Sequence, residues 1–427
     1  MIDRQLYDNF KEILRSELIP ALGCTEPGAI AYGASQARSL LGSMPESMEL
    51  WCSGNIVKNV KGVIVPNSGG MRGIEAAAVL GMLAGHSQPD DCDLEVLNSI
   101  TCDDISEAEK LLKEGFCQCH LAEDTPNLYI KVLVRGNGHE AQIIIEGSHT
   151  NITGRILDGK PIYSSASCSG DDMAEKLKDH LSVKKILQFA EALTEKDGRE
   201  LFSAQIRDNT AIAEEGLSGN YGARVGQTLL KTRDEGSVRA RAVAKAAAGS
   251  DARMNGCELP VVINSGSGNQ GITVSVPVIE YARELGAGEE QLYRALLISN
   301  LTAIHLKEGI GRLSAYCGAV SAGTGAGAGI AYLLGGGYEE IIHTVVNTLA
   351  NVSGIVCDGA KASCAAKIAS AVDAGILGYY MYRNGQEFVD GDGIVKKGVE
   401  STIANVARLG RDGMRDTDRE ILDIMIG

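Results

Sequence analysis

Three cysteines in the C-terminal half of the chain could hold a metal–sulfide cluster. Cys357 and Cys364 lie close together, and Cys317 lies further upstream. We expect Asp358 to cap a helix over residues 359–382, which would place two thiols near the helix N-terminus, where the dipole favours negative charge. Three thiolates from two segments would leave one iron of a [4Fe–4S] cluster open. Three buried structural thiols are the alternative interpretation.

Cys24 has a different setting, just before a predicted helix. That helix should begin at Thr25 or Glu26, with Pro27 in its first turn. A helix N-terminus lowers the pKa of a nearby thiol, because the positive end of the dipole stabilises the thiolate. Cys24 is therefore a candidate nucleophile or base. A residue at the helix entry with no chemical role is the alternative.

A glycine-rich segment follows the short apolar run 261–263 and reads Ser265-Gly266-Ser267-Gly268-Asn269-Gln270-Gly271. It lacks the Gly-Lys-Ser/Thr ending of a P-loop, which disfavours a nucleotide. Successive backbone N–H groups in such a segment can hold a small anion such as a carboxylate. The first six residues are therefore a candidate substrate-binding loop. A loop that needs only positive φ values is the alternative.

The remaining cysteines form no recognisable metal motif. No Cys-x-x-Cys pair occurs in the chain, and the separations within a second group of thiols are irregular. We therefore expect free thiols there rather than a zinc site. That second group consists of Cys92, Cys102, Cys117, Cys119 and His120. The cysteines with no assigned partner are Cys52, Cys168 and Cys257.

Composition and charge exclude several classes of protein. The chain has 427 residues and a net charge of −15, which is unfavourable for binding nucleic acid or an anionic membrane. No segment has the apolar density of a membrane-spanning helix. The count of eleven cysteines is odd, and the first residues are charged, unlike a signal peptide. We therefore expect reduced thiols in a cytoplasmic protein.

Two kinds of region must position these residues. Residues 45–168 alternate strand and helix patterns, with a hairpin around residues 136–138, and predict an α+β domain. Residues 171–427 predict an all-helical domain, packed through Gly and Ala because only 4% of the chain is aromatic. Residues 1–44 predict two helices that carry Cys24 and pack on the helical domain. The predicted fold class is α+β, with a small α+β domain and a larger all-helical one.

Local patterns give finer predictions within these regions. Strand patterns cover residues 49–65, interrupted at 53–55, as well as 94–97, 129–134 and 141–146, and a helix covers 106–114. The helical period recurs over residues 183–193, 200–217, 221–248, 277–286, 289–306, 312–334, 338–352, 359–382 and 397–410.

Four motifs resemble those of the L-cysteine desulfidase family, which is related to the alpha part of bacterial iron–sulfur L-serine dehydratases. The resemblance runs over essentially the whole chain, with the motifs in the right order. They read Gly23-Cys24-Thr25-Glu26-Pro27-Gly28-Ala29, Ser265-Gly266-Ser267-Gly268-Asn269-Gln270-Gly271, Arg312-Leu313-Ser314-Ala315-Tyr316-Cys317-Gly318 and Cys357-Asp358-Gly359-Ala360-Lys361-Ala362-Ser363-Cys364.

The resemblance implies a lyase that works without pyridoxal phosphate and converts L-cysteine to pyruvate, ammonia and sulfide on a [4Fe–4S] cluster. It implies Cys317, Cys357 and Cys364 as cluster ligands and Cys24 as the proton acceptor. An open iron would bind the leaving sulfur, and a thiolate base would remove the Cα proton. The chain ends at residues 424–427 without the C-terminal cysteine of the serine dehydratases, which disfavours transfer of their autoinhibition.

Other functions are alternatives to this interpretation. L-Serine could be the substrate of the same cluster, since the two amino acids differ by one atom. A pyridoxal-phosphate lyase needs a Schiff-base lysine and a phosphate cup, and Lys361 and Lys367 have no phosphate-loop pattern beside them. A non-catalytic amino-acid-binding protein is the third alternative. We expect a small amino acid as the ligand, and the small-residue helices are compatible with a homodimer.

Overall fold

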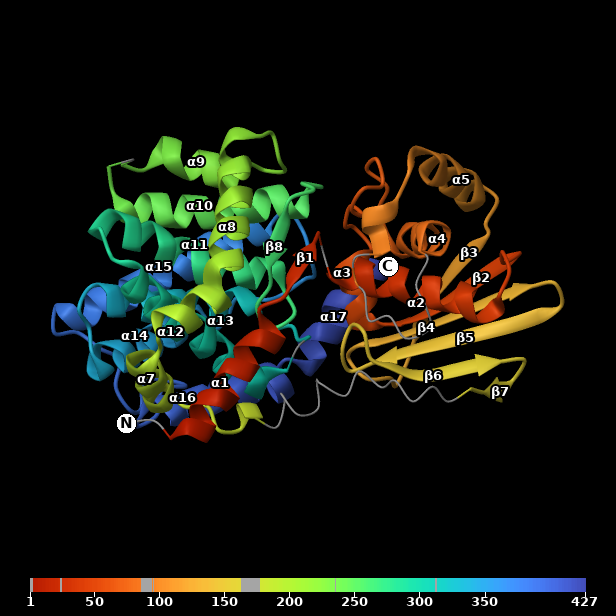
Figure 1. The fold of residues 1–427 in the computed structure, drawn as a ribbon. Coiled ribbons are helices and arrows are strands. Elements are labelled where there is room, and N and C mark those ends of the chain that lie inside the picture. The colour runs from red at the N-terminus through yellow and green to blue at the C-terminus, as the bar shows by residue number, and fades with distance from the viewer. Residues whose placement is uncertain are drawn as a thin grey trace. The chain divides into compact units, whose positions relative to one another are not determined.

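The computed structural model divides the chain into two compact units. The smaller unit contains a sheet and the larger one is helical, which confirms the predicted α+β fold class (Figure 1). The helical unit contains residues 1–20, 172–357 and 362–417, and the sheet unit contains residues 21–171, 358–361 and 418–427. The structure describes residues 3–23, 25–85, 94, 96–162, 177–234, 236–311 and 313–427.

Six strands form the sheet of the sheet unit in the order β3–β2–β4–β5–β6–β7 (Figure 1). β2 and β3 are parallel, and the other neighbouring strands are antiparallel. The strands are β2 (Ser47–Ser53), β3 (Cys117–Ala122), β4 (Tyr129–Gly136), β5 (His139–Glu146), β6 (Ile152–Leu157) and β7 (Lys160–Pro161).

Two helices cover the sheet in layers. Helix α2 (Thr25–Leu41) packs against β4 and β5, whose inward side chains are apolar and buried. Gly33 allows this close approach, because a Cβ there would lie 3.2 Å from Cγ2 of Val132. Helix α4 (Ile74–Ala84) crosses α2 at Gly81, where a Cβ would lie 2.3 Å from the α2 backbone. Small residues therefore set the spacing of these layers.

The predicted hairpin around residues 136–138 is confirmed. β4 and β5 are antiparallel, and their pairing closes at Gly136 and His139. The turn residues Asn137 and Gly138 have φ values of 54° and 79°. A two-residue turn with positive φ at both positions matches the right-handed twist of the paired strands.

The strand predicted over residues 49–65 is only half right. β2 ends at Ser53, and the chain continues as helix α3 (Gly54–Val60). Ile56 and Val60 are both buried and lie one helical turn apart. A short apolar run of this kind satisfies a helix as well as a strand, so periodicity alone did not distinguish them.

Two other local predictions differ from the structure. The predicted strand at 94–97 is wrong over its described C-terminal part, since Val96–Ser99 form a 3-10 helix (η1). Helix α5 (Cys102–Lys113) begins before the predicted residue 106, because Thr101 and Asp104 cap one another's backbone at its N-terminus.

The region predicted as residues 1–44 is divided between the units. Helix α1 (Arg4–Glu17) belongs to the helical unit, where Phe10 packs against Phe189 with ring centroids 5.6 Å apart. The strand β1 (Pro20–Leu22) follows. Helix α2 was predicted to pack on the helical domain and instead belongs to the sheet unit. The first thirteen residues of α2 are all buried, and the sheet and α4 provide their cover.

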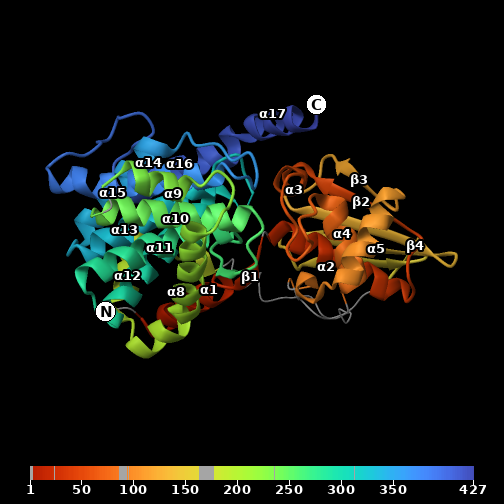
Figure 2. The same cartoon turned by 90° about the horizontal axis from the view of Figure 1, so that it is seen from above.

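The helical unit is built from long helices joined by short connections (Figure 2). They are α7 (Val183–Ala192), α8 (Glu195–Ser218), α9 (Val225–Thr232), α10 (Val238–Met254), α11 (Gly268–Leu285), α12 (Glu289–Ile310), α13 (Gly318–Leu333), α14 (Tyr338–Val352), α15 (Cys364–Arg383) and α16 (Val399–Arg408). A short strand, β8 (Pro260–Val262), precedes α11.

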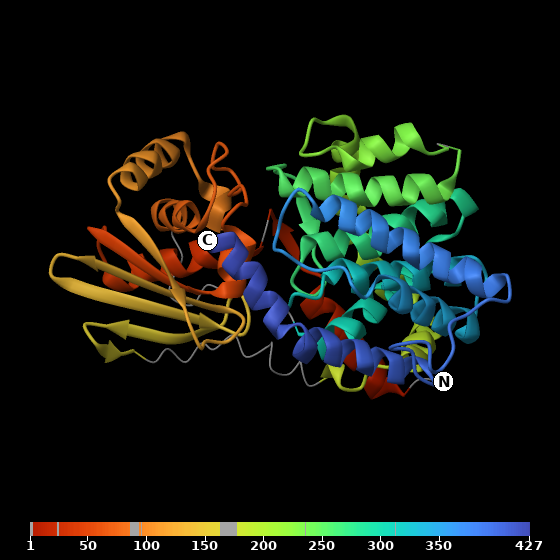
Figure 3. The same cartoon turned by 180° about the vertical axis from the view of Figure 1, so that it is seen from behind.

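Several helix boundaries differ from the predicted ones. The helix predicted over 221–248 is two helices, α9 and α10, and α13 begins after residue 317 instead of at 312. Helix α11 begins at Gly268 and contains Pro277, the residue predicted to start it. Burial of α11 outweighs the cost of an internal proline. A π-helical turn (Leu409–Gly413) and helix α17 (Arg415–Ile426), which ends at the label C in Figure 3, follow α16 and were not predicted.

Helix α13 shows the predicted close packing of small residues. A Cβ at Gly325 would lie 2.3 Å from the carbonyl oxygen of Ser299 in α12. A Cβ at Gly323 would lie 2.6 Å from the backbone of Ala371 in α15. The neighbouring backbones thus occupy the space of the missing side chains. Across the described ranges, no helix is long and apolar enough to cross a membrane.

Candidate active site

Two short segments of the helical unit bring Cys317 and Cys357 side by side. The N–H of Cys317 donates to the carbonyl of Ile355 at 3.1 Å, and the N–H of Cys357 donates to the carbonyl of Ala315 at 2.6 Å. The residues between them form an antiparallel bridge. The two thiols hydrogen-bond to one another. Two of the three predicted ligands are therefore in direct contact.

The third predicted ligand, Cys364, lies close enough to Cys317 for an electrostatic interaction. It is the first residue of α15, and its charge acts on the thiol of Cys317, which is the N-cap residue of α13. Cys317 was predicted inside a helix and Cys364 in a second turn. The structure places both at helix starts, because residues 358–363 form turns before α15 begins. The positive ends of two helix dipoles would stabilise negative charge at these positions once a bound cation displaces the thiol protons.

The thiol group has the donor chemistry that an iron–sulfur cluster needs. The hydrogen bond with Cys357, together with burial, raises the pKa of Cys317 well above its usual range. Cys317 therefore holds its proton in the absence of a cation, and metal binding would release that proton because metals bind the thiolate. Sulfur donors of this soft kind suit iron–sulfur chemistry.

A site for a single metal ion is not formed. Within the described ranges, no three His, Cys, Asp or Glu side chains are grouped closely enough to hold one ion. In a cluster, each cysteine binds a different iron, so its ligands need not converge on one point.

The second group of thiols also lacks a zinc site in its described members. Cys119 of β3 hydrogen-bonds to Cys52 of the adjacent strand β2. Cys102 is exposed at the start of α5. The described cysteines of this group, Cys102, Cys117 and Cys119, form no disulfide. Cys92 and Cys168 lie outside the described residues.

The candidate substrate loop is a tight turn that leads into α11. Ser265 and Gly266 have φ values of 49° and 77°, so the turn needs left-handed backbone. Asn264 and Ser267 exchange backbone hydrogen bonds of 3.1 and 3.0 Å. The Ser267 hydroxyl then accepts from the N–H of Gln270 at 3.5 Å and caps the helix. The loop therefore presents the N-terminus of α11, a favourable place for an anion.

The loop lies beside the thiols. Gln270, in the first turn of α11, packs against Gly318, the residue after Cys317. A Cβ at Gly318 would lie 2.7 Å from Cδ of Gln270. The predicted substrate loop and the predicted cluster ligands are thus neighbours within one unit, although the sequence separates them widely.

A buried network of amides holds the loop in place. Ser265 Oγ donates to Asn264 Oδ1 at 3.0 Å, and Asn264 Nδ2 donates to Asn300 Oδ1 at 3.0 Å. Asn300 Nδ2 in turn donates to Gln205 Oε1 at 2.9 Å. These polar groups satisfy one another, which fixes the loop on the rigid helices α8 and α12.

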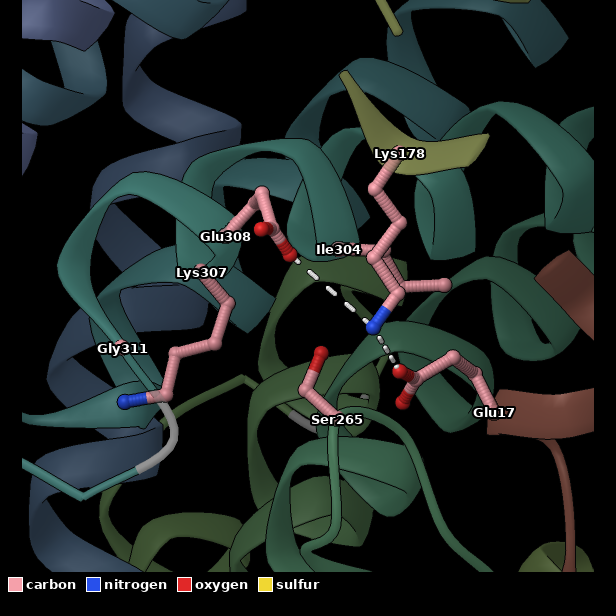
Figure 4. Close-up of a pocket in the computed structure, with 7 residues that line it drawn as sticks. All are labelled: Glu17, Lys178, Ser265, Ile304, Lys307, Glu308 and Gly311. Atoms are coloured by element: carbon pink, nitrogen blue, oxygen red, sulfur yellow. Dashed lines mark hydrogen bonds and ion pairs between the residues drawn. The ribbon is translucent and has the colours of Figure 1, made fainter. Parts of the chain in front are cut away.

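A charged pocket of about 170 Å³ borders Ser265 of this loop. Its lining residues are Glu17, Lys178, Ser265, Ile304, Lys307, Glu308 and Gly311. Figure 4 shows the ammonium group of Lys178 pointing toward the carboxylates of Glu17 and Glu308. Lys178 donates to Glu17 and lies 3.9 Å from Glu308. The main charges of this pocket already neutralise one another.

Cys24 itself lies outside the described residues, so its role stays a prediction. Helix α2 does begin at Thr25, as predicted. The next residue, Glu26, is buried and accepts a hydrogen bond from Asn59 Nδ2 at 3.3 Å.

Sequence reasoning missed three charged residues near the loop. Glu17 and Lys178 are far apart in the chain, and nothing local marks them as a pair. Arg253 was also missed, although a lone arginine at the end of an Ala-rich helix is a signal that could have been noticed.

Comparison with known proteins shows which family the chain resembles. A family model described as the serine dehydratase alpha chain matches residues 93–423. A UPF0597 protein of Desulfitobacterium hafniense is 53% identical over 420 residues, which cover 98% of this chain and 97% of that protein. A UPF0597 protein of Lachnoclostridium phytofermentans is 49% identical and covers 99% of this chain and 100% of its own length. A third, from Finegoldia magna, is 46% identical, covering 98% of this chain and 99% of its own length.

Proposed function

Because the chain belongs to the serine dehydratase alpha chain family, we propose that it is a lyase that removes the β-substituent of a small α-amino acid. We infer further that the substrate is L-cysteine and that the reaction depends on a [4Fe–4S] cluster, without pyridoxal phosphate. The observation that carries this proposal is the backbone bridge that joins the segments of Cys317 and Cys357 beside the first turn of α11, with Cys364 within electrostatic range of Cys317. One water is consumed, and pyruvate, ammonia and hydrogen sulfide are released.

In this proposal, Cys317, Cys357 and Cys364 hold three irons of the cluster. When bound, the cluster supplies a Lewis-acidic iron with an open position for the leaving group. The protein contributes thiolates at two helix N-termini, where the dipoles stabilise their negative charge.

The chain's own residues bind the substrate and move its proton. The first turn of α11 holds the substrate carboxylate through backbone N–H groups. Cys24 takes the Cα proton as a thiolate, and its position before α2 supports this role because a helix N-terminus favours that ionised form. The C–S bond electrons leave with the sulfur, and the resulting aminoacrylate hydrolyses to pyruvate and ammonium in water.

L-Serine is the second candidate substrate, and the description of the matching family favours it. The same residues would then eliminate water instead of hydrogen sulfide.

Anaerobic purification followed by two activity assays tests the proposal. We expect bound iron and acid-labile sulfide, together with faster sulfide release from L-cysteine than pyruvate release from L-serine. The reverse ranking would assign the serine reaction. Protein without iron and without either activity, even after anaerobic reconstitution, would overturn the proposal.

Cysteine variants assign the roles. Each of Cys317→Ala, Cys357→Ala and Cys364→Ala should lose cluster iron, while the matched control Cys257→Ala, at another buried thiol, should retain it. Cys24→Ala should keep its iron and lose activity by roughly 10²–10⁴-fold, the usual contribution of a general base. Full activity in that variant would exclude Cys24 as the base.

A further inference from the structure

Arg253 is a buried cation for which the described residues provide no hydrogen-bond acceptor at Nε. It lies near the C-terminal end of α10 and is only 5% exposed. Within the part of the chain that the structure describes, its Nε has no hydrogen-bond partner and no carboxylate forms an ion pair with it. The other arginines of α10 differ, since Arg239 pairs with Asp373 at 2.8 Å and Arg241 with Glu280 at 2.8 Å. A buried charge of this kind is costly unless something pairs with it.

The guanidinium of Arg253 covers the first residue of α11. A Cβ at Gly268 would lie 2.3 Å from Nε and 2.8 Å from Cζ of Arg253. The N–H groups of Gly268 and Asn269 lie in the first helical turn, where no preceding carbonyl of the helix can accept from them. A cation at the positive end of a helix dipole is unfavourable on its own. A bound anion would stabilise both the Arg253 guanidinium and the N-terminus of α11.

Two acceptors lie in the same turn. Asn269 Oδ1 and Gln270 Oε1 are buried and, among the described residues, have no hydrogen-bond partner. Orphaned acceptors of this kind call for a donor, as an ammonium group would supply. Arg253 and the first-turn N–H groups can therefore donate to an anion. The side-chain oxygens of Asn269 and Gln270 can accept from a cation.

This pattern of charges matches a free α-amino acid. A zwitterion carries a carboxylate and an ammonium group on one carbon, so it satisfies both sets at once. A carboxylic acid satisfies only the donors, and an amine satisfies only the acceptors. Gln270 also packs against Gly318, next to Cys317, so a ligand held here would lie close to the thiols.

We propose that Arg253 and the first turn of α11 form the subsite for the two charged groups of an α-amino acid. Arg253 and the N–H groups of Gly268 and Asn269 bind the carboxylate, while the side-chain oxygens of Asn269 and Gln270 bind the ammonium group. The inference rests on the proposed function for the reaction that follows binding. Arg253 is a binding residue here and takes no part in proton transfer.

Binding of unreactive ligands tests the subsite without relying on catalysis. Isothermal titration calorimetry on the full-length, anaerobically purified protein would use L-alanine, which has both charged groups and no leaving group. L-Alaninamide lacks the carboxylate, and propionate lacks the ammonium group. We expect L-alanine to bind at least about tenfold more tightly than either, since each loses one set of charged hydrogen bonds. Equal binding of the three ligands, or no binding of L-alanine, would overturn the proposal.

Two variants separate the halves of the subsite. Arg253→Gln should lower the affinity for L-alanine by about tenfold or more. It should also abolish the preference for L-alanine over L-alaninamide. Gln270→Met should reduce the preference for L-alanine over propionate and leave propionate binding unchanged. Arg239→Gln is the matched control on the same helix, because Arg233 also pairs with Asp373 there, and it should bind as the wild type does.

A folding defect would not obscure the result. Arg253→Lys keeps the charge in nearly the same volume and should restore part of the affinity, which a purely structural role would not predict. Wild-type L-alanine affinity in Arg253→Gln would overturn the proposal. If L-alanine binding behaves as expected but neither L-cysteine nor L-serine is consumed, the subsite stands and the proposed lyase function fails. If lyase activity is present but Arg253→Gln leaves KM unchanged, the subsite fails alone.

Discussion

Two buried cations of the helical unit, Lys178 and Arg253, have opposite surroundings. Lys178 is 4% exposed, donates to Glu17 and lies 3.9 Å from Glu308. Arg253 is 5% exposed, and the described residues offer its Nε no acceptor. A buried charge with its partner in place holds the fold together, whereas one without a partner is available to a ligand. The difference separates a structural pocket from a binding site, although both border the same loop.

The largest expected effect on the free energy of unfolding comes from breaking the ion pair of Lys178 with Glu17. Glu17→Gln should lower the free energy of unfolding by about 3 kcal/mol, because it leaves the Lys178 ammonium group buried without its carboxylate partner. Urea denaturation measures this change. The double variant Glu17→Leu/Lys178→Met, which removes both charges, should recover most of the loss. A single-variant loss below about 1 kcal/mol would contradict the structural role of this pair.

Helix α10 also contains a buried carboxyl group, that of Asp251. Burial raises its pKa to about 6, although the N–H of Gly226 donates to it at 3.0 Å. The native state therefore binds a proton that the unfolded state has released above about pH 4. Stability from this group is fully present below the unfolded pKa and is lost as pH rises through about 6.

Asp251→Asn should therefore stabilise the protein at neutral pH by about 2 kcal/mol, since the amide needs no proton and still accepts from Gly226. The gain should shrink as the pH falls toward about 5 and disappear below the unfolded pKa. Urea denaturation across this pH range tests the prediction. A gain that does not change with pH would show that Asp251 does not titrate between these values.

The sheet unit contains a third buried cation, and it is paired. Lys58 is 1% exposed and donates to Asp418, which also accepts from Asn55 at 2.9 Å. Asp418→Asn should lower the free energy of unfolding by about 1.5 kcal/mol, less than at Glu17 because Asp418 is partly exposed. Thermal denaturation of this variant beside Asp416→Asn, a nearby carboxylate, gives the comparison. Equal stability of the two variants would argue against the pair.

Arg253→Gln should have the smallest effect on the ligand-free protein. It removes a buried charge that has no partner among the described residues, so the free energy of unfolding should change by less than about 1 kcal/mol and can rise. The same urea measurements reveal this change. A loss as large as that of Glu17→Gln would mean that Arg253 supports the fold and would remove the contrast with Lys178.

Features set by neighbouring residues were predictable from the sequence. The turn at Asn137 and Gly138 needs positive φ, and both residues tolerate it. The start of α11 was also within reach, since Ser267 followed by Gln270 three positions later is a capping-box pattern. We missed it because the run of glycines indicated a loop.

Features that depend on distant contacts were not predictable. The three cysteines could be proposed as ligands, but the backbone bridge that joins Cys317 to Cys357 exists only in the fold. Helix α2 could be recognised, but not its place against the sheet. Arg253 is of interest because the described residues offer its Nε no acceptor. The sequence alone cannot show that such a partner is missing.

The glycines of α13 have a consequence for the thiols. Cys317 and Cys364 sit at the ends of α13 and α15, and those helices meet where Gly323 faces Ala371 and Gly327 faces Gly375. Gly323 lies about 9 Å along the helix axis from Cys317. One added methyl group at Gly323 would push the two helix backbones apart and carry the two sulfurs with them. The distance between the sulfurs of Cys317 and Cys364 therefore depends on small residues in the interior of the helix pair. These residues would touch neither metal nor substrate.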